Sequence, residues 1–161
     1  MNRDKPILVT GASGFVGRHL IPVLNRAGYL TRLASRRPVA EPSPSPTQKW
    51  VPFDIENEPT VIRALTGCDT AFYLLHAMSM SGDFEQRESA WAQSFARIAA
   101  QCGVRRIIYL GGIEPSGAPS KHLRSRLKTG DILRNSGVST VELRAGMIVG
   151  VGSESWNIVR D

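Results

Sequence analysis

The sequence predicts an α/β fold in which a parallel β-sheet is covered by helices on both faces. Short strand-like runs alternate with helix-like segments along the whole chain of 161 residues. This alternation is typical of a parallel sheet whose strands are joined by helical crossovers. A glycine-rich turn also joins the first strand to the first helix. Because the length fits one domain, we expect residues 1–161 to form a single domain.

The strand-like segments are short and mostly apolar. We expect six of them, over residues 6–10, 30–35, 50–53, 70–75, 106–110 and 139–143. Six strands joined by crossovers match a three-layer Rossmann fold, with a parallel sheet of order 3-2-1-4-5-6 and helices on both faces.

Four helices are expected, over residues 14–27, 59–65, 84–102 and 121–135. The first is expected to bury a side that carries Val16, Leu20, Val23 and Leu24. The longest has apolar residues at helical spacing, namely Trp91, Phe95, Ile98 and Cys102. Closely spaced prolines forbid a regular helix over 38–47, so we expect a loop there. The tail SESWNIVRD resembles the start of a further helix.

The composition of the chain limits the classes of protein to which it can belong. The chain has no run of about 18 apolar residues, so we expect no membrane span. Its first residues lead directly into a strand, without the apolar stretch of a secretory signal. Cys68 and Cys102 fit no metal or redox spacing, so we expect no metal site and a reducing, cytoplasmic location. The net charge of +6 fits an anionic cofactor, and without a known binding motif nucleic acid is not expected as the main partner.

The strongest motif is the turn Thr10-Gly11-Ala12-Ser13-Gly14-Phe15-Val16-Gly17, between the first strand and the first helix. The first glycine allows the tight bend, the second lets the backbone approach a pyrophosphate, and the third lets helix and strand pack closely. N–H groups at the helix start then face the phosphates. The strand before and the helix after it favour this interpretation over a turn without a ligand. We expect cofactor contacts from Gly11, Ser13, Gly14, Phe15, Val16 and Gly17.

The end of the second strand bears on which dinucleotide binds. A site for NAD usually has an acidic residue about 20 positions after the glycine turn, where it binds the ribose 2′-hydroxyl. Here the chain reads Ser35-Arg36-Arg37, without an acid. A guanidinium suits the 2′-phosphate of NADP, so we expect NADP(H) to be favoured over NAD(H). The alternative is a pair of solvated surface arginines.

Two other strand ends carry candidate cofactor contacts, because ligands of parallel sheets bind at the carboxyl ends of the strands. Asp54 and Ile55 are placed to contact the adenine, unless Asp54 only caps the next turn. Leu75, His76 and Ala77 come at the end of the fourth strand and are expected to line the cofactor cleft.

Several longer stretches resemble a known group of proteins. They are YLLHAM (73–78), IIYLGGI (107–113), HLRSR (122–126), ELRA (142–145) and IVGVGS (148–153). Together with the glycine turn, they resemble bacterial atypical short-chain dehydrogenases/reductases that bind NAD(P)H. This group is akin to NmrA-like regulators and to the Rossmann accessory subunit of respiratory complex I. Its members are usually longer, with a C-terminal part that completes the substrate pocket, and that part is not expected within residues 1–161.

Ordinary short-chain dehydrogenases use a serine after the fifth strand and a Y-x-x-x-K pair on the next helix. Laid on this sequence, their pattern places Gly112 at the serine, His122 at the tyrosine and Arg126 at the lysine. His122 is a candidate general acid, since imidazole titrates near neutrality, and Arg126 is a candidate for holding ribose or phosphate. The alternative is that His122 is a structural or surface histidine. Tyr109 lies within a strand and is expected in the core.

Two functions remain open from the sequence. The first is the NADP(H)-binding domain of an oxidoreductase that acts on an unidentified small molecule, with the cofactor carrying the hydride chemistry. The second is a cofactor-binding sensor or assembly subunit without turnover, which the missing serine and tyrosine favour. The fold alone does not decide between them.

Overall fold

A computed structural model of the chain describes residues 4–37, 46–77 and 83–153. Within these residues the strands are β1 (Ile7–Val9), β2 (Thr31–Ser35), β3 (Gln48–Pro52), β4 (Thr70–Tyr73), β5 (Arg106–Gly112) and β6 (Ser139–Ala145). The helices are α1 (Phe15–Arg26), α2 (Glu58–Leu65), α3 (Phe84–Gln101) and α4 (Lys121–Arg134). The expected loop over 38–47 and the expected helical tail lie largely outside the described residues.

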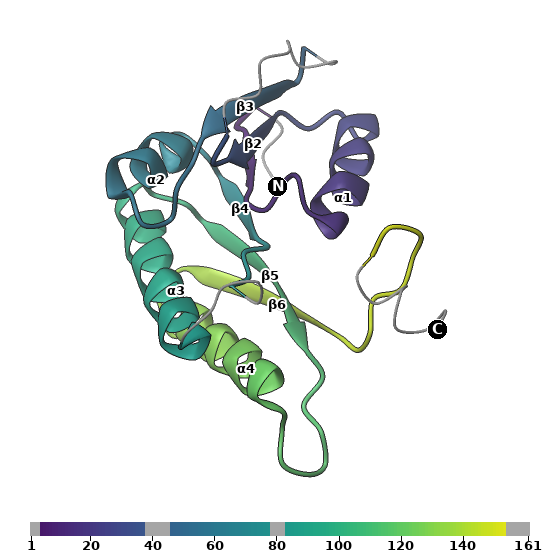
Figure 1. The fold of residues 1–161 in the computed structure, drawn as a ribbon. Helices are drawn as coiled ribbons and strands as arrows, with labels where there is room; N and C mark the ends of the chain where they lie inside the picture. The colour runs from purple at the N-terminus through teal and green to yellow at the C-terminus, as the bar shows by residue number, and fades with distance from the viewer. Residues whose placement is uncertain (1–3, 38–45, 78–82, 154–161) are drawn as a thin grey trace.

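The six strands form one parallel sheet of order β3-β2-β1-β4-β5-β6. This confirms the predicted fold class and strand order. Figure 1 shows the sheet running through the middle of the molecule, and β3 and β6 form its edges. Because all strands are parallel, their carboxyl ends meet at one edge of the sheet, where the predicted cofactor contacts lie.

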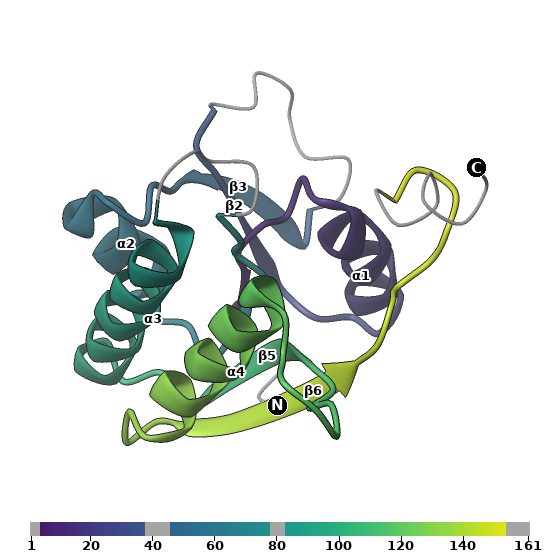
Figure 2. The same cartoon turned by 60° about the horizontal axis from the view of Figure 1, so that its bottom comes forward.

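The two faces of the sheet are covered unequally, as Figures 1 and 2 show. On one face α1 is the one helix among the described residues, and its Ile21 and Leu24 join a cluster with residues of β1, β2, β4 and β5. On the other face α2, α3 and α4 share a larger core, which includes Phe95, Tyr73 and Tyr109. The burial of Tyr109 confirms that it belongs to the core, and its hydroxyl donates a hydrogen bond of 2.9 Å to Arg126 O.

Some details differ from the sequence prediction. The buried side of α1 carries Gly17, Ile21 and Leu24, whereas Val23 is 51% exposed. The expected burial of Val23 was wrong because the close approach of Gly17 to the glycine turn sets the rotation of the helix. β4 ends two residues early, and the Leu74 N–H bonds to the Thr10 hydroxyl. β6 runs two residues further than predicted and pairs with the end of β5.

None of the helices in the described part of the chain is long and apolar enough to cross a bilayer. Over the same residues, no group of three or more His, Cys, Asp or Glu side chains is arranged to hold a metal ion.

Candidate functional site

The carboxyl edge of the sheet brings the predicted cofactor-binding residues together. The glycine turn follows β1, Arg36 and Arg37 follow β2, Asp54 and Ile55 follow β3, and the segment 75–77 follows β4. Residues from four separate strand ends therefore lie along one edge. α4, which carries His122 and Arg126, contacts α3 and the segment after β4.

The three glycines of the turn have different surroundings. Gly11 has a φ of +60°, a conformation that favours glycine, and a Cβ there would lie 2.6 Å from Leu74 O. At Gly17 a Cβ would lie 2.5 Å from Gly11 O, so helix and turn are in direct contact. At Gly14 a Cβ would meet, among the described residues, only Gly11 O, at 3.1 Å. Gly14 is also the N-cap of α1 and offers no side-chain cap, which leaves N–H groups of the first turn for a ligand.

Phe15, the first residue of α1, faces other parts of the chain. Its ring lies 4.5 Å from the His19 ring, centroid to centroid. It also contacts the segment that follows β6, because a Cβ on Gly150 would lie 2.7 Å from Phe15 Cζ. In Figure 1 this yellow segment returns from the end of β6 toward α1. The chain after β6 therefore packs beside the glycine turn.

The end of β2 presents two exposed cations. Arg36 and Arg37 are both exposed, and the Arg37 N–H donates to the Ser35 hydroxyl at 3.2 Å. This bond shapes the bend that follows β2. Both guanidinium groups are accessible to an anionic ligand.

The segment after β3 is tied to the fold by its own hydrogen bonds. Asp54 Oδ1 accepts from the Glu56 N–H at 3.1 Å, and the Asp54 N–H donates to the Thr60 hydroxyl at 2.9 Å. The Asp54 carboxylate thus caps the turn, as in the alternative that the sequence left open. Ile55 is 8% exposed and belongs to the core, so a cofactor contact there would come from its backbone.

A buried carboxylate that the sequence analysis missed holds the segment after β4. Glu88, in α3, is 5% exposed and accepts a hydrogen bond of 2.8 Å from the Ala77 N–H. Ser125, in α4, donates to the other carboxylate oxygen. Glu88 lies on the inner side of α3, among apolar residues such as Ala92 and Phe95. A charged residue within an apolar helical stripe was the sequence signal that could have found it.

His76 and Arg126 face each other at the carboxyl edge. Arg126 Nη1 donates to His76 Nε2 at 3.3 Å, and Nη2 donates to Leu110 O at 2.7 Å. Because His76 Nε2 accepts, the proton of the neutral ring sits on Nδ1, which lies 4.0 Å from Glu88 Oε1. Desolvation by the surrounding protein and the neighbouring Arg126 guanidinium lower the pKa of His76 to about 4, against the opposing effect of Glu88, although the side chain keeps 30% of its surface exposed. His76 is therefore a neutral imidazole at pH 7.

Gly112 occupies the position where ordinary short-chain dehydrogenases have a serine. A Cβ at Gly112 would lie 2.4 Å from Leu123 Cδ1 and 3.8 Å from Arg126 Nε. Leu123 and the Arg126 side chain thus fill the space that a serine would need. The small Gly112 thus leaves room for the Leu123 and Arg126 side chains, and a serine at position 112 would require Leu123 to move.

His122 and Arg126 lie on α4 one turn apart, but they contact different groups. The His122 ring stacks on the Phe84 ring, with centroids 4.7 Å apart and planes 19° apart. The Lys121 ammonium lies 5.7 Å from the same Phe84 centroid. His122 is exposed at the first turn of the helix, whereas Arg126 reaches inward to Leu110.

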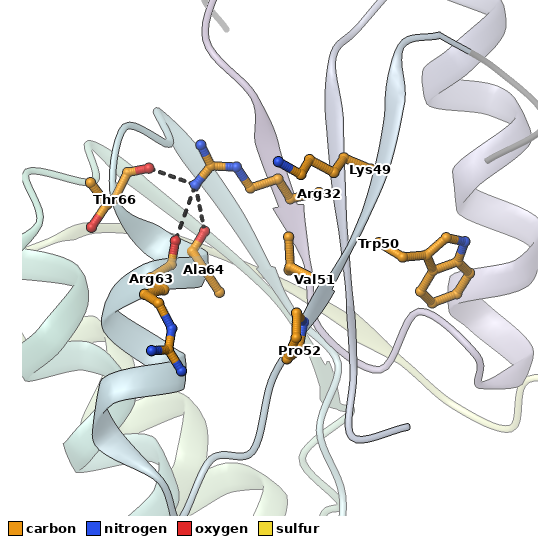
Figure 3. Close-up of a pocket in the computed structure, with 8 residues that line it drawn as sticks. All are labelled: Arg32, Lys49, Trp50, Val51, Pro52, Arg63, Ala64 and Thr66. Atoms are coloured by element: carbon orange, nitrogen blue, oxygen red, sulfur yellow. Dashed lines mark hydrogen bonds between the residues drawn. The ribbon is translucent and has the colours of Figure 1, made fainter. Parts of the chain in front are cut away.

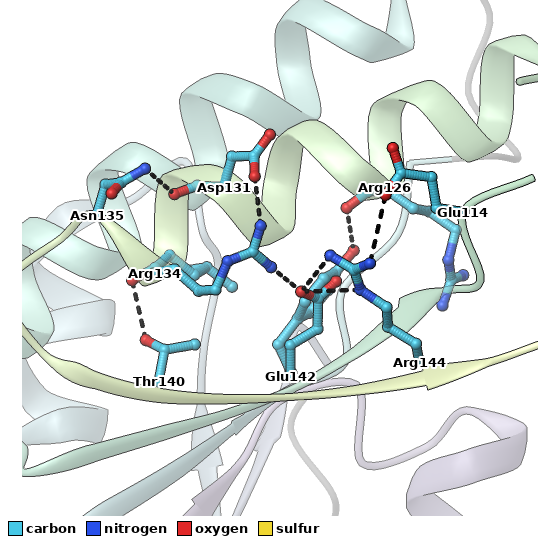
Figure 4. A network of polar contacts seen from close by, with 10 residues as sticks. Glu114, Arg126, Asp131, Arg134, Asn135, Thr140, Glu142 and Arg144 are labelled. Carbon is cyan, nitrogen blue, oxygen red and sulfur yellow. Dashed lines mark hydrogen bonds and ion pairs between the residues drawn. The ribbon is translucent and has the colours of Figure 1, made fainter. Parts of the chain in front are cut away.

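A network of polar contacts fixes α4 against β6 (Figure 4). The buried Glu142 carboxylate, from β6, forms ion pairs with Arg134 of α4 and with Arg144. A Cβ at Gly111 or Gly130 would lie less than 3 Å from Glu142 Oε1, so these glycines make room for the carboxylate. With α4 held in this way, Arg126 is placed beside β5.

A recess in the described part of the chain lies away from this edge. It has a volume of about 440 Å³ and lies between β2, β3 and the end of α2 (Figure 3). Arg32 Nη1 donates there to three backbone carbonyls, those of Arg63, Ala64 and Thr66. Since Arg32 caps the carboxyl end of α2, it stabilises the fold. Arg32 and Lys49 lie toward the amino ends of β2 and β3, so the recess is separate from the carboxyl-edge site.

Comparison with known proteins identifies the family. The profile of the NAD dependent epimerase/dehydratase family matches residues 7–137, which span β1 to the end of α4. The chain belongs to this family. The finding confirms the predicted resemblance to atypical short-chain dehydrogenases/reductases. The matched residues include the glycine turn, the basic end of β2 and Arg126.

Curated relatives of this epimerase/dehydratase domain are longer proteins. The chain is 32% identical over 113 residues to a 3-beta-hydroxysteroid dehydrogenase from Mycolicibacterium neoaurum. That match covers 64% of this chain and 31% of the relative. The chain therefore spans less than a third of the length of the curated relatives it matches.

Solved structures share the fold of the domain. A short-chain dehydrogenase/reductase superfamily protein from Agrobacterium tumefaciens, with bound NAD, matches with a TM-score of 0.70 and 21% identity. The match covers 86% of this chain and 48% of that chain. A double mutant of NmrA matches with a TM-score of 0.74 and 20% identity, over 91% of this chain and 46% of that one. At these identities the likeness concerns the fold alone.

Proposed function

We propose that this domain binds NADP(H) and serves as the cofactor-binding part of an oxidoreductase. The observation that carries the proposal is the pairing of a complete glycine turn with the exposed cations Arg36 and Arg37 after β2. The turn offers first-turn N–H groups, and little besides Gly11 O faces Gly14, where a pyrophosphate would lie. Arginine at the end of β2 favours a phosphate on the ribose rather than a free 2′-hydroxyl.

The residues present fit a nicotinamide dinucleotide along the carboxyl edge. The glycine turn, with Ser13, Phe15 and Val16 at the start of α1, would hold the pyrophosphate, and Ser35 with the two arginines would hold the 2′-phosphate. Asp54 and the Ile55 backbone would lie by the adenine, and the segment 75–77 by the nicotinamide half. When bound, the cofactor supplies a hydride equivalent to a carbonyl carbon, and a proton must reach the carbonyl oxygen.

The proton donor is a separate part of the proposal. Arg126 does not exchange its proton, and His76 is neutral at pH 7 because its pKa is about 4. His122, exposed at the start of α4, is the general acid that we propose, with Arg126 as the group that binds ribose or substrate. The second candidate function, a sensor or assembly subunit without turnover, is favoured by Gly112, because Leu123 fills the space of the missing serine.

The cofactor preference is tested by titrating NADPH and NADH into the protein and measuring both affinities by calorimetry. We expect tighter binding of NADPH, and a loss of about 10- to 100-fold in NADPH affinity for Arg36→Ala with little change for NADH. Arg106→Ala is the matched control, because this exposed arginine lies at the amino end of β5. Equal affinities for the two cofactors would refute the preference.

Turnover is tested by following the oxidation of bound NADPH in a single turnover with aldehydes and quinones. The enzyme proposal expects oxidation that slows by about 10²–10⁴-fold in His122→Ala. The control is His19→Ala, a histidine on α1 whose ring lies tilted against Phe15 and away from α4. Tight NADPH binding without oxidation by any compound would favour the sensor. Oxidation that is insensitive to His122→Ala would remove His122 as the acid.

A further inference from the structure

Arg126 is a partly buried guanidinium without a carboxylate partner among the described residues. Ion pairs with Asp or Glu are formed instead by Arg87, Arg97, Arg105, Arg124, Arg134 and Arg144. Arg32, which is also partly buried, has three carbonyls at the end of α2. Arg126 donates to one carbonyl and to the neutral His76. A guanidinium has five N–H groups, so it retains donors for a ligand.

The fold holds this guanidinium in place without neutralising it. The Leu110 carbonyl and His76 Nε2 fix it from two sides, and Tyr109 binds the backbone of the same residue. The acidic group that faces His76 is Glu88, which lies against Nδ1 and bonds to Ser125 and Ala77. Gly112 leaves the space along which the Arg126 side chain runs.

We propose that Arg126 binds a carboxylate group of the substrate, so that the domain acts on an oxo acid or a hydroxy acid rather than on a neutral carbonyl compound. A guanidinium presents a planar pair of donors that matches a carboxylate, and partial burial strengthens such a pair. This inference rests on the proposed function, because that function places the reacting carbonyl at the carboxyl edge. It accounts for an arginine where ordinary short-chain dehydrogenases use a lysine.

The test uses oxamate, a carboxylate probe, with the neutral diamide oxamide as its counterpart. Both are titrated into the wild-type protein, with and without NADP⁺, while the ring signals of the three histidines are followed by NMR. We expect oxamate to shift the His76 signal, since His76 Nε2 accepts from Arg126, and to leave the His19 signal in place. Oxamide is expected to shift neither. The variant His76→Gln assigns the His76 signal.

Variants then locate the contact. Arg126→Gln is expected to weaken oxamate binding by about 10- to 100-fold, and Arg126→Lys to restore part of it as a point charge without the planar fork. Arg124→Gln, on the same helix but paired with Glu85, is expected to bind oxamate like wild type.

Three results would overturn the inference: equal binding of oxamate and oxamide, unchanged oxamate affinity in Arg126→Gln, or no oxamate binding with or without NADP⁺. If Arg126→Gln does not fold, the comparison of oxamate with oxamide on the wild-type protein still tests whether a carboxylate is bound. Absence of NADP⁺ binding would instead contradict the proposed function, and the titration without cofactor would still report on the carboxylate site.

Discussion

Ser125 of α4 donates a hydrogen bond to the carboxylate of Glu88 in α3, and both residues are buried. The second carboxylate oxygen accepts from the Ala77 N–H, so one side chain joins α3, α4 and the segment after β4. The same segment carries His76, which binds Arg126. The positions of His76 and Arg126 therefore depend on Glu88.

Glu88→Ala is expected to destabilise the domain, because it leaves the Ala77 N–H and the Ser125 hydroxyl buried without their acceptor. The free energy of unfolding should fall by about 1–3 kcal/mol for each buried group left unpaired, as measured by urea denaturation. Glu88→Gln should lose less, since its amide oxygen still accepts from Ala77. Gln93→Ala, at an exposed position of α3, is the control. A loss for Glu88→Ala no larger than that of the control would contradict the linking role.

The stability of the domain should depend on pH through His76. Its pKa is about 4 in the folded protein and about 6.5 in the unfolded chain, so only the unfolded state takes up the proton between these values. The contribution of His76 is therefore complete above pH 6.5 and is lost as the pH falls toward 4. We expect the difference in unfolding free energy between wild type and His76→Gln to change over this range, when measured at about pH 7 and about pH 4.5. His122→Gln is the control, and a constant difference for His76→Gln would show that the folded ring titrates normally.

Substitutions at two glycines of the turn should have different effects, one on cofactor binding and the other on stability. Gly14→Val is expected to abolish cofactor binding and leave the domain folded, because the new side chain would meet little protein and would occupy the phosphate space. Gly17→Val is expected to destabilise the fold by about 1–3 kcal/mol, because its Cβ would lie 2.5 Å from Gly11 O. The stability of both variants is measured by thermal unfolding, and their cofactor affinity by titration. Normal cofactor affinity in a folded Gly14→Val would show that the turn is not the phosphate site.

Restoring a serine at position 112 should not restore an ordinary dehydrogenase site. Gly112→Ser places a Cβ 2.4 Å from Leu123 Cδ1, so the Leu123 side chain must shift; because this side chain is flexible and half-buried, we expect a loss of stability of only about 1 kcal/mol. The double variant Gly112→Ser with Leu123→Ala should lose less than the two single changes added together, since the second change removes the clash. Additive losses in thermal unfolding would mean that Leu123 does not fill the serine position.

Much of the fold follows from local patterns in the sequence. The strand order is predictable because strands and helices alternate along the chain. The glycine turn is predictable because the bend at Gly11, with its positive φ, is set by a short segment. Which side of a helix is buried is harder to predict from the sequence, and Val23 of α1 is an example. Its exposure depends on how α1 rotates against the turn, which is a matter of packing between segments.

The sequence by itself determined the fold class, the glycine turn at the edge that we propose for the cofactor, and the basic end of β2, because each depends on residues close together in the chain. Only the tertiary structure decided what surrounds Arg126. Its contacts join residues that are 50 positions apart for His76 and 16 for Leu110, while Glu88 and Ser125 are separated by 37. No local periodicity encodes such contacts, since they form when α3, α4 and the strand ends pack together. The absence of a carboxylate beside this guanidinium in the described chain is likewise visible only once the elements are assembled.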